Sequence, residues 1–253
     1  MRTNPVARQT LTRFRNPVAL GALVLGLLLS AFPGAAQALD VAPWQRVLTA
    51  HVRGGGFDYA GLRADPERLA DLNRFVEAVG AMDDGEPLAS WLNAYNALVV
   101  HGIITRYPLD SVRDVDGFFN TVTHRIAGHS RTLDYVENQV IRPRFHDARI
   151  HVALNCGARS CPALSSRAFT TRTLDRDLDR LARAAVANRR HVRVVDGGLR
   201  VSEIFFWFSA DFERDAGSVV GWLKRFGGEA ITALPDDAPL SRLRYDWRLN
   251  AAR

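Results

Sequence analysis

The only two cysteines of the chain stand in one short segment, RIHVALNCGARSCP, which also carries a histidine. Cys156 and Cys161 are five residues apart, and His151 precedes them in an apolar stretch. An imidazole next to a cysteine can activate it to the thiolate that attacks a carbonyl carbon. In an oxidising compartment the two cysteines could instead form one small disulfide. Metal ligation is the weakest alternative, because no second cysteine pair completes a tetrahedral site. We therefore expect no metal and no cofactor.

Polar side chains also interrupt two predicted helices. Asn93 and Asn96 fall in the first half of the apolar segment WLNAYNALVVHGI, where an amide without a hydrogen bond is costly. They either hold a neighbouring loop or form a polar pocket at the start of the helix. Asp134 and Glu137 are three residues apart on a short helix, so they share a face and could act as paired carboxylates. Asp134 is equally suited to cap that helix.

The start of the chain has the features of a secretory signal peptide. Four arginines and no acid precede an apolar run from Val18 to Phe32, and the small-x-small pattern of a cleavage site ends at Ala38. The run is shorter than the roughly 18–20 residues that span a bilayer. We expect residues 1–38 to be removed, a periplasmic or secreted location, and no stable membrane span after that removal.

Part of the excess of basic over acidic residues lies in this leading segment. The sequence has 33 Lys and Arg against 27 Asp and Glu, a net charge of +6. Without the four leading arginines, 29 basic residues remain against 27 acidic ones, about +2. Acids alternate with the arginines in RDLDRLAR and RLRYDWR, and no basic stripe with spaced aromatics appears. We expect no nucleic-acid partner.

The elements that position the candidate residues are of mixed type. Hairpins clustered among helices, without regular strand–helix alternation, predict an α+β fold in which helices pack on a small, mainly antiparallel sheet. Residues 39–253 are expected to form a single domain. The run IFFWF at 204–208 could line a pocket or fill the core, and we expect it to fill the core. Hydrophobic periodicity and turn residues predict helices at 43–51, 66–79, 87–106, 133–141, 173–188 and 218–226, hairpins at 120–134 and 191–202, and strands at 149–154 and 243–247.

The strand expected at 149–154 bears on the chemistry. Alternation along it places His151, Ala153 and Asn155 on one face. His151 and Cys156 would then have opposite parity, unless the chain turns at Asn155. In that arrangement the base for Cys156 would come from elsewhere.

Five motifs together resemble the bacterial domain-of-unknown-function 547 family: WLNAYNAL, TLDYVENQVIR, RIHVALNCGARSCPAL, VSEIFFWFSADF and YDWRLN. Their order and spacing match over about residues 57–250. The resemblance implies a scaffold similar to the papain-like and transglutaminase-like cysteine hydrolases, with no established substrate. Many members have histidine after the glutamate that matches Glu137, whereas this chain has Asn138, so His151 would have to serve as the base. The family motif carries over onto Trp91, Asn93, Tyr95, Asn96, Glu137, His151, Cys156, Cys161 and Pro162.

Two functions follow from these residues and from the resemblance. The prediction is an exported, non-catalytic binding or accessory module for a peptide-like or cell-envelope ligand, with the two cysteines bridged. The alternative is a cysteine-dependent amide hydrolase or transferase in the periplasm, since the related scaffolds place a cysteine and a histidine together. The helix expected from residue 87 offers no cysteine, so the nucleophile would have to be one of the pair in the later loop. The catalytic candidates are His151, Cys156 and Cys161, and the binding candidates are Asn93, Tyr95, Asn96 and Glu137.

Overall fold

The first long helices begin where local signals in the sequence predict. The computed structural model describes residues 39–195 and 197–252, so the predicted signal peptide lies outside the described residues. Helix α1 (Ala42–His51) has a proline in its first turn. Helix α3 (Pro66–Ala81) follows Asp65, whose carboxylate accepts a hydrogen bond of 3.0 Å from the backbone N–H of Arg68. An N-terminal proline and an aspartate cap both favour the start of a helix.

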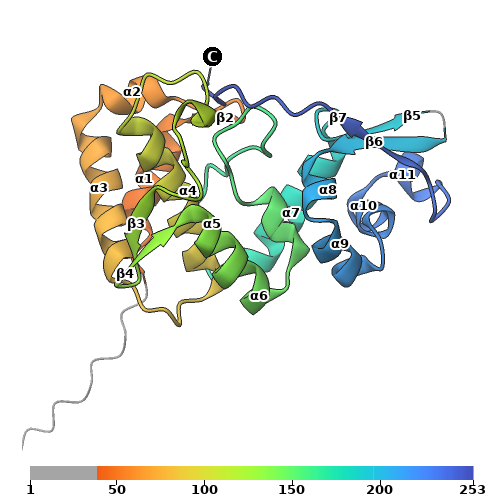
Figure 1. Ribbon diagram of the computed structural model, residues 1–253, viewed down its shortest axis with the longest axis horizontal. Helices are drawn as coiled ribbons and strands as arrows, with labels where there is room; N and C mark the ends of the chain where they lie inside the picture. The colour runs from red at the N-terminus through yellow and green to blue at the C-terminus, as the bar shows by residue number, and fades with distance from the viewer. Residues whose placement is uncertain (1–38, 196, 253) are drawn as a thin grey trace, which may run out of the picture. The chain divides into compact units, whose positions relative to one another are not determined.

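Helix α4 (Leu88–Ile104) lies in the core of the first half of the described chain. All of its residues except His101 are buried. The helix carries apolar side chains on all of its faces, so other parts of the protein must cover the whole helix. Helices α2 (Tyr59–Arg63) and α3 pack against it (Figure 1). The predicted helix at 87–106 is confirmed. The short strands β1 (Val52–Arg53) and β2 (Gly56–Phe57) pair between α1 and α2.

A β-hairpin leads into the segment that carries Glu137. Strands β3 (Thr123–Ile126) and β4 (His129–Thr132) pair antiparallel, and the two residues between them have φ angles of 49° and 77°. Positive φ at both turn positions fits the twist of a two-residue hairpin. The predicted hairpin and the helical character of 133–141 are confirmed, although wider π turns replace the later α turns. The chain continues as helix α5 (Leu133–Tyr135), the π-helix η2 (Val136–Ile141) and helix α6 (Arg142–Phe145).

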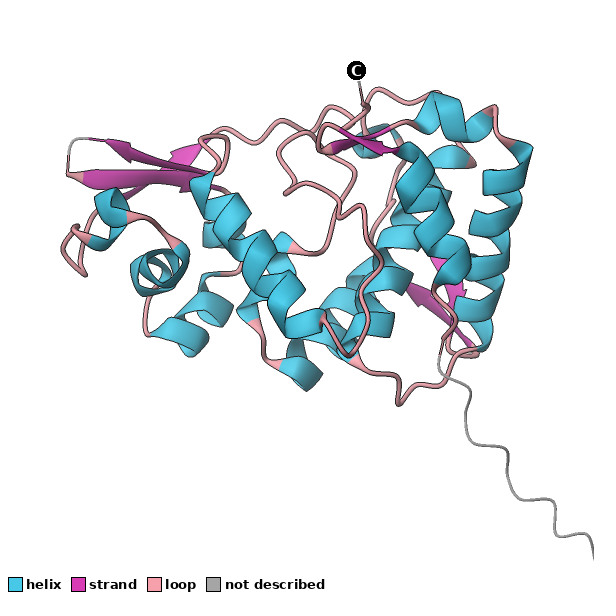
Figure 2. Ribbon diagram, turned by 180° about the vertical axis from the view of Figure 1, so that it is seen from behind, coloured by secondary structure: helices cyan, strands magenta, loops and turns pink. Residues whose placement is uncertain are grey.

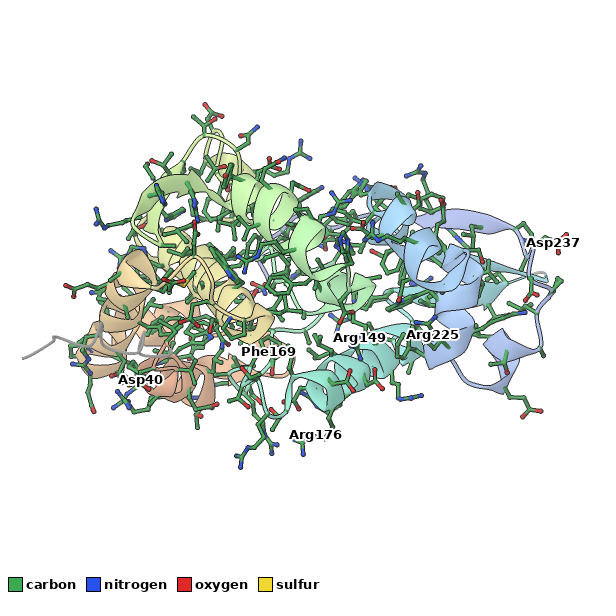
Figure 3. All side chains as sticks on the ribbon, turned by 90° about the horizontal axis from the view of Figure 1, so that it is seen from below. Asp40, Arg149, Phe169, Arg176, Arg225 and Asp237 are labelled. Atoms are coloured by element: carbon green, nitrogen blue, oxygen red, sulfur yellow. A yellow bond between two sulfur atoms is a disulfide. The ribbon has the colours of Figure 1, made fainter. Side chains whose placement is uncertain are left out.

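Residues 149–154, predicted as a buried strand, are mostly helical instead. The 3₁₀-helix η3 (Ala148–Val152) is capped by Asp147, whose carboxylate accepts a hydrogen bond of 2.9 Å from the backbone N–H of Arg149. The Arg149 guanidinium also contacts two aspartates of helix α7 (Leu174–Ala187), which holds η3 against that helix (Figure 3). A short apolar run fits a strand and a buried helix equally well. The face assignments that rest on the strand prediction are therefore wrong.

The last third of the chain contains a three-stranded sheet. Strands β5 (Val192–Val195) and β6 (Gly198–Ser202) form the predicted hairpin, and β7 (Leu240–Leu243) pairs with β6 in parallel. Figure 2 shows helices making up most of the structure, with the strands in separate small sheets. The α+β prediction is confirmed. The chain between β6 and β7 forms helices α8 (Ile204–Trp207), α9 (Ser209–Ala216), α10 (Val219–Phe226) and α11 (Glu229–Thr232).

The strand predicted at 243–247 is wrong beyond its first residue, because β7 ends at Leu243. Residues 244–252, here the C-terminal segment, cross back toward β2 (Figure 1). There the backbone of Asp246 both donates to and accepts from Ser160. These contacts replace the hydrogen bonds of a strand ladder. They bring the aromatic residues of the segment next to residues 153–162, the loop after η3 that contains both cysteines and is here called the cysteine loop.

The described residues belong to one compact unit. In this described part of the chain, no helix has the length and apolar character that a membrane crossing requires.

Candidate functional site

A cavity of about 310 Å³ opens between the cysteine loop, helix η2, helix α8 and the C-terminal segment. Aromatic rings make up much of its wall, so we call it the aromatic cavity. Its carboxyl, amide and imidazole groups come from α5, η2 and η3, and its tyrosine hydroxyls from α4 and the C-terminal segment. It is lined by Tyr95, Phe119, Asp134, Glu137, Asn138, His151, Leu154, Cys156, Cys161, Ile204, Trp207, Phe208, Tyr245 and Trp247.

The two cysteines form one wall of the aromatic cavity. Their sulfur atoms lie 2.07 Å apart, which is the distance of a disulfide bond. This agrees with the disulfide alternative from the sequence. The hydroxyl of Tyr245 lies 3.2 Å from the Cys156 sulfur and 3.3 Å from the Cys161 sulfur. A bridged sulfur is not a thiolate, so neither cysteine can act as a nucleophile in this state.

His151 is held from one side by a carboxylate. Its Nε2 lies 2.8 Å from Oδ2 of Asp211, and its ring stacks on Phe208 with the centroids 3.9 Å apart. Burial lowers the pKa of His151, although the hydrogen bond to Asp211 opposes this shift. The imidazole is therefore neutral at pH 7.

Asp211 determines which nitrogen of His151 carries the hydrogen. Burial acts to raise the pKa of Asp211, but hydrogen bonds from His151, Arg142 and Arg214 outweigh it and hold this pKa well below its usual range. An ionised carboxylate only accepts hydrogen bonds, so Nε2 of His151 is the donor. The other ring nitrogen, Nδ1, is then an acceptor. It is buried and has no hydrogen-bond partner in the described residues.

Glu137 faces this acceptor. Its Oε1 lies 3.9 Å from Nδ1 of His151, beyond hydrogen-bond distance, while its Oε2 accepts a hydrogen bond of 3.1 Å from the Tyr95 hydroxyl. Burial raises the pKa of Glu137 to about 7, against the opposing effects of Tyr95 and Arg142. Glu137 can therefore gain or lose a proton near neutral pH, which is the property of a general acid or base.

Asn138 occupies the position where many members of the resembled family have histidine. Its amide donates to Asp134 at 2.9 Å and accepts from Arg142 at 2.6 Å. Asp134 and Glu137 both line the cavity, as their shared helix face predicts. Asn138 fixes the neighbours of Glu137 but cannot itself exchange a proton.

Asn93 and Asn96 are not among the residues that line the aromatic cavity. Asn93 exchanges two hydrogen bonds with the backbone of Phe169, and Asn96 bonds the carbonyl of Ala153 and the N–H of Asn155. These contacts match the loop-holding alternative. Both asparagines therefore act through the loops that they position, whereas Tyr95, from the same helix, reaches the cavity.

The run IFFWF divides between the core and the cavity, so its assignment to the core alone is wrong. Phe205 is buried in the core, while Ile204, Trp207 and Phe208 line the aromatic cavity. Trp207 is 46% exposed and lies with its ring centroid 4.8 Å from that of Tyr245. The one-turn helix α8 explains the division, because neighbouring positions point in different directions.

Sequence reasoning missed Asp211, the residue that orients His151. Sixty residues separate the two, and no spacing rule links them. The available signal was the position of Asp211 inside the motif VSEIFFWFSADF, three residues before Arg214.

Residues 79–184 match the model of a protein family described as "Protein of unknown function, DUF547". This match supports the resemblance over the region that contains Tyr95, Glu137, His151 and both cysteines. Asp211 and the C-terminal segment lie outside it. The comparisons with curated proteins and with solved structures give no match.

Proposed function

We propose that the protein is an exported binding module, acting in the periplasm or outside the cell, whose ligand places an N–H group in the aromatic cavity. One observation carries the proposal: Glu137 Oε1 and His151 Nδ1 face each other 3.9 Å apart with no hydrogen bond between them. A ligand nitrogen placed about 2.9 Å from each atom would donate a hydrogen bond to both. The disulfide beside this position leaves no thiol for covalent chemistry.

The walls of the cavity specify the rest of the ligand. Trp207, Tyr245 and Trp247 contribute aromatic surface of the kind that binds apolar chains and cations, while Phe208 packs its ring on His151. When Glu137 is ionised, the two facing atoms are both acceptors, so the ligand must supply the donors. A primary ammonium on an aliphatic chain satisfies both parts of the cavity. Such a group fits the peptide-like or cell-envelope ligand that the sequence predicts.

Tryptophan fluorescence tests this proposal on the oxidised protein. Trp207 and Trp247 line the cavity, so a ligand there changes their emission. The probe is N-acetyl-lysine methylamide, and its matched control is N-acetyl-norleucine methylamide, which lacks the ammonium group. We expect the lysine probe to bind at least about tenfold more tightly, since a desolvated charged hydrogen bond and cation–π contacts are lost in the control. Equal binding of the two probes would contradict the proposal.

A pair of matched variants places the probe at Glu137. Glu137→Gln keeps the size of the side chain and removes its charge, so the preference for the lysine probe should disappear. The control Glu213→Gln removes a charge from an exposed site on α9 that does not line the cavity, and it should leave the preference intact. An identical loss in both variants would assign the preference to the general charge of the protein.

A second candidate function is a cysteine-dependent amide hydrolase or transferase that is active only when reduced. The observation in its favour is that Cys156 lines the same cavity as His151, whose Nε2 is held by Asp211. This arrangement resembles the nucleophile, base and orienting group of papain-like enzymes. An external dithiol would reduce the bridge and itself become a disulfide. Nδ1 of His151 would take the proton of the Cys156 thiol, and the resulting thiolate would attack the amide carbonyl. The imidazolium would pass this proton to the leaving amine, and water would hydrolyse the thioester to regenerate the thiol.

Turnover after reduction tests this second function. Reduced protein should cleave a capped peptide anilide, Cys156→Ser should abolish the cleavage, and Cys161→Ser should retain it. Absence of cleavage by the reduced protein would leave the binding module as the function of the site.

A further inference from the structure

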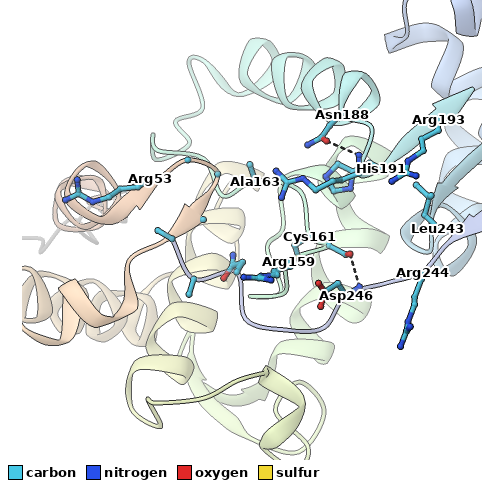
Figure 4. Close-up of a pocket in the computed structure, with 18 of the residues that line it drawn as sticks. Arg53, Arg159, Cys161, Ala163, Asn188, His191, Arg193, Leu243, Arg244 and Asp246 are labelled. Atoms are coloured by element: carbon cyan, nitrogen blue, oxygen red, sulfur yellow. Dashed lines mark hydrogen bonds between the residues drawn. The ribbon is translucent and has the colours of Figure 1, made fainter.

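A second cavity lies on the other side of the cysteine loop and is strongly basic. It has a volume of about 790 Å³, and its acidic lining residue is Asp246. Figure 4 shows Arg159 beside Cys161 and Asp246 in the middle of this cavity, with Arg53 and Arg193 to either side. We call it the arginine cavity. The arginines that line it are Arg53, Arg159, Arg190, Arg193, Arg200 and Arg244.

The charges of these arginines are largely uncompensated in the described residues. Arg53 has an acid, Asp58, at 3.8 Å, and none of the other five has a described carboxylate within 4.0 Å. Asp246 compensates them only in small part, because its carboxylate pairs at 2.5 Å with Arg248, which does not line the cavity, and the charge of Arg159 has a smaller effect on its pKa. Arg149, outside this cavity, differs from them because its guanidinium pairs with three aspartates.

The sheet also brings two of these charges together. Arg193 on β5 and Arg200 on β6 are direct partners in the antiparallel register. Like charges at opposed positions of paired strands are unfavourable. An anion between them and the other guanidinium groups would remove this repulsion.

We infer that the arginine cavity binds a small polyanion that carries several phosphate or carboxylate groups. Guanidinium groups form two parallel hydrogen bonds with either group, which suits both to this lining. The volume falls within the range of about 300–1,000 Å³ for small-molecule sites and exceeds what a single phosphate would fill. Several arginines around one concave space favour a ligand with several charges over a simple ion.

This site does not depend on the function proposed for the aromatic cavity. Cys161 lines both cavities, so the two share a wall, but their other lining residues differ. Polyanion binding can therefore fail while amine binding succeeds, and the reverse. The arginines reach one cavity from β1, the cysteine loop, the turn between α7 and β5, the strands β5 and β6, and the C-terminal segment. No basic stripe therefore appears in the sequence.

Calorimetric titration with inorganic tripolyphosphate, orthophosphate and citrate tests the inference. We expect tripolyphosphate or citrate to bind the purified protein at least about tenfold more tightly than orthophosphate at low salt, and to weaken as salt rises. Tighter tripolyphosphate binding would assign phosphate groups to the ligand, and tighter citrate binding would assign carboxylates. Equal, weak binding of all three anions would overturn the inference.

Two double variants show whether the cavity itself binds. Arg159→Ala with Arg190→Ala removes two cavity charges whose side chains make no hydrogen bond in the described residues. Arg167→Ala with Arg172→Ala removes two charges from exposed positions outside the cavity. The first pair should weaken binding about tenfold or more, and the second less than about twofold. The same loss in both would show diffuse attraction to a basic surface and overturn the site.

A folding control keeps this test decisive. Each double variant is melted by circular dichroism before titration. If the cavity variant unfolds, the single variant Arg190→Ala, at an exposed residue, takes its place and should still weaken binding several-fold relative to Arg172→Ala. Equal affinities of these two single variants would also overturn the inference.

Discussion

Glu137 should make the protein less stable as the pH rises through neutrality. Its pKa is raised from 4.5 to about 7 in the folded protein, chiefly by burial, and its side chain is 14% exposed. Between these two pKa values the folded protein binds a proton that the unfolded chain has lost, so stability falls with pH. A shift of this size corresponds to about 3 kcal/mol, most of it between pH 5 and pH 8. Glu137→Gln removes this titrating group, so the free energy of unfolding of the variant should not fall in this way as the pH rises.

Urea unfolding of the oxidised protein at pH 5 and pH 8 measures the effect. The quantity to compare is the free energy of unfolding of Glu137→Gln minus that of wild type at each pH, because the titration of the histidines then cancels. This difference should change by roughly 2–3 kcal/mol in favour of the variant at pH 8. Glu213→Gln, at an exposed position, should follow wild type at both values. Parallel pH dependence in wild type and Glu137→Gln would refute the buried, proton-exchanging role of this carboxyl.

Three further substitutions test the contacts around the cavity. Asp211→Asn leaves two arginines without their shared carboxylate and should lower the free energy of unfolding by about 3–5 kcal/mol. Asn96→Ala removes two buried hydrogen bonds to the backbone at Ala153 and Asn155, at a cost of about 2–4 kcal/mol. Replacing both cysteines by serine opens a small loop and should cost about 2 kcal/mol.

Urea unfolding measures all three, and exposed positions supply the controls. Asp237→Asn and Asn120→Ala alter the same residue types at exposed sites and should change stability by less than about 0.5 kcal/mol. A cost for Asn96→Ala no larger than that for Asn120→Ala would remove the loop-holding role. Asp211→Asn as stable as wild type would show that the ion-pair cluster is not required for the fold.

Local signals explain the parts of the fold that the sequence predicts well. Asp65 and Pro66 define the start of α3, and the apolar face of α7 repeats with helical period. The hairpin at 123–132 needs the positive φ angles that Ala127 and Gly128 adopt. Each of these features depends on residues close together in the chain, where propensity and capping decide the outcome.

The predictions of secondary structure from the sequence are wrong where contacts between distant residues determine the local conformation. Residues 148–152 form a 3₁₀-helix because Asp147 caps it and aspartates of α7 hold Arg149. The segment after Leu243 leaves the sheet because its backbone finds partners in the cysteine loop. Neither partner can be identified from hydrophobic periodicity.

In the candidate site, too, local patterns were predictable from the sequence and distant contacts were not. The sequence motifs bring forward Glu137, His151 and the cysteine pair, because each stands in a short and unusual pattern. Asp211 and the arginine cavity escape notice, since their members come from separate segments and meet only in the folded chain. The pKa of Glu137 is likewise a property of its surroundings, not of its neighbours in sequence.

The structure places a closed cysteine bridge, and no thiol, in the wall of the aromatic cavity. Alkylation of the protein recovered from its own compartment, under denaturing conditions and without reductant, tests this claim directly when the product is weighed by mass spectrometry. The structure predicts no label on Cys156 or Cys161 until the protein is reduced, and then one label on each. Two labels without reductant would contradict the claim and make the thiol-dependent enzyme the better account of the site.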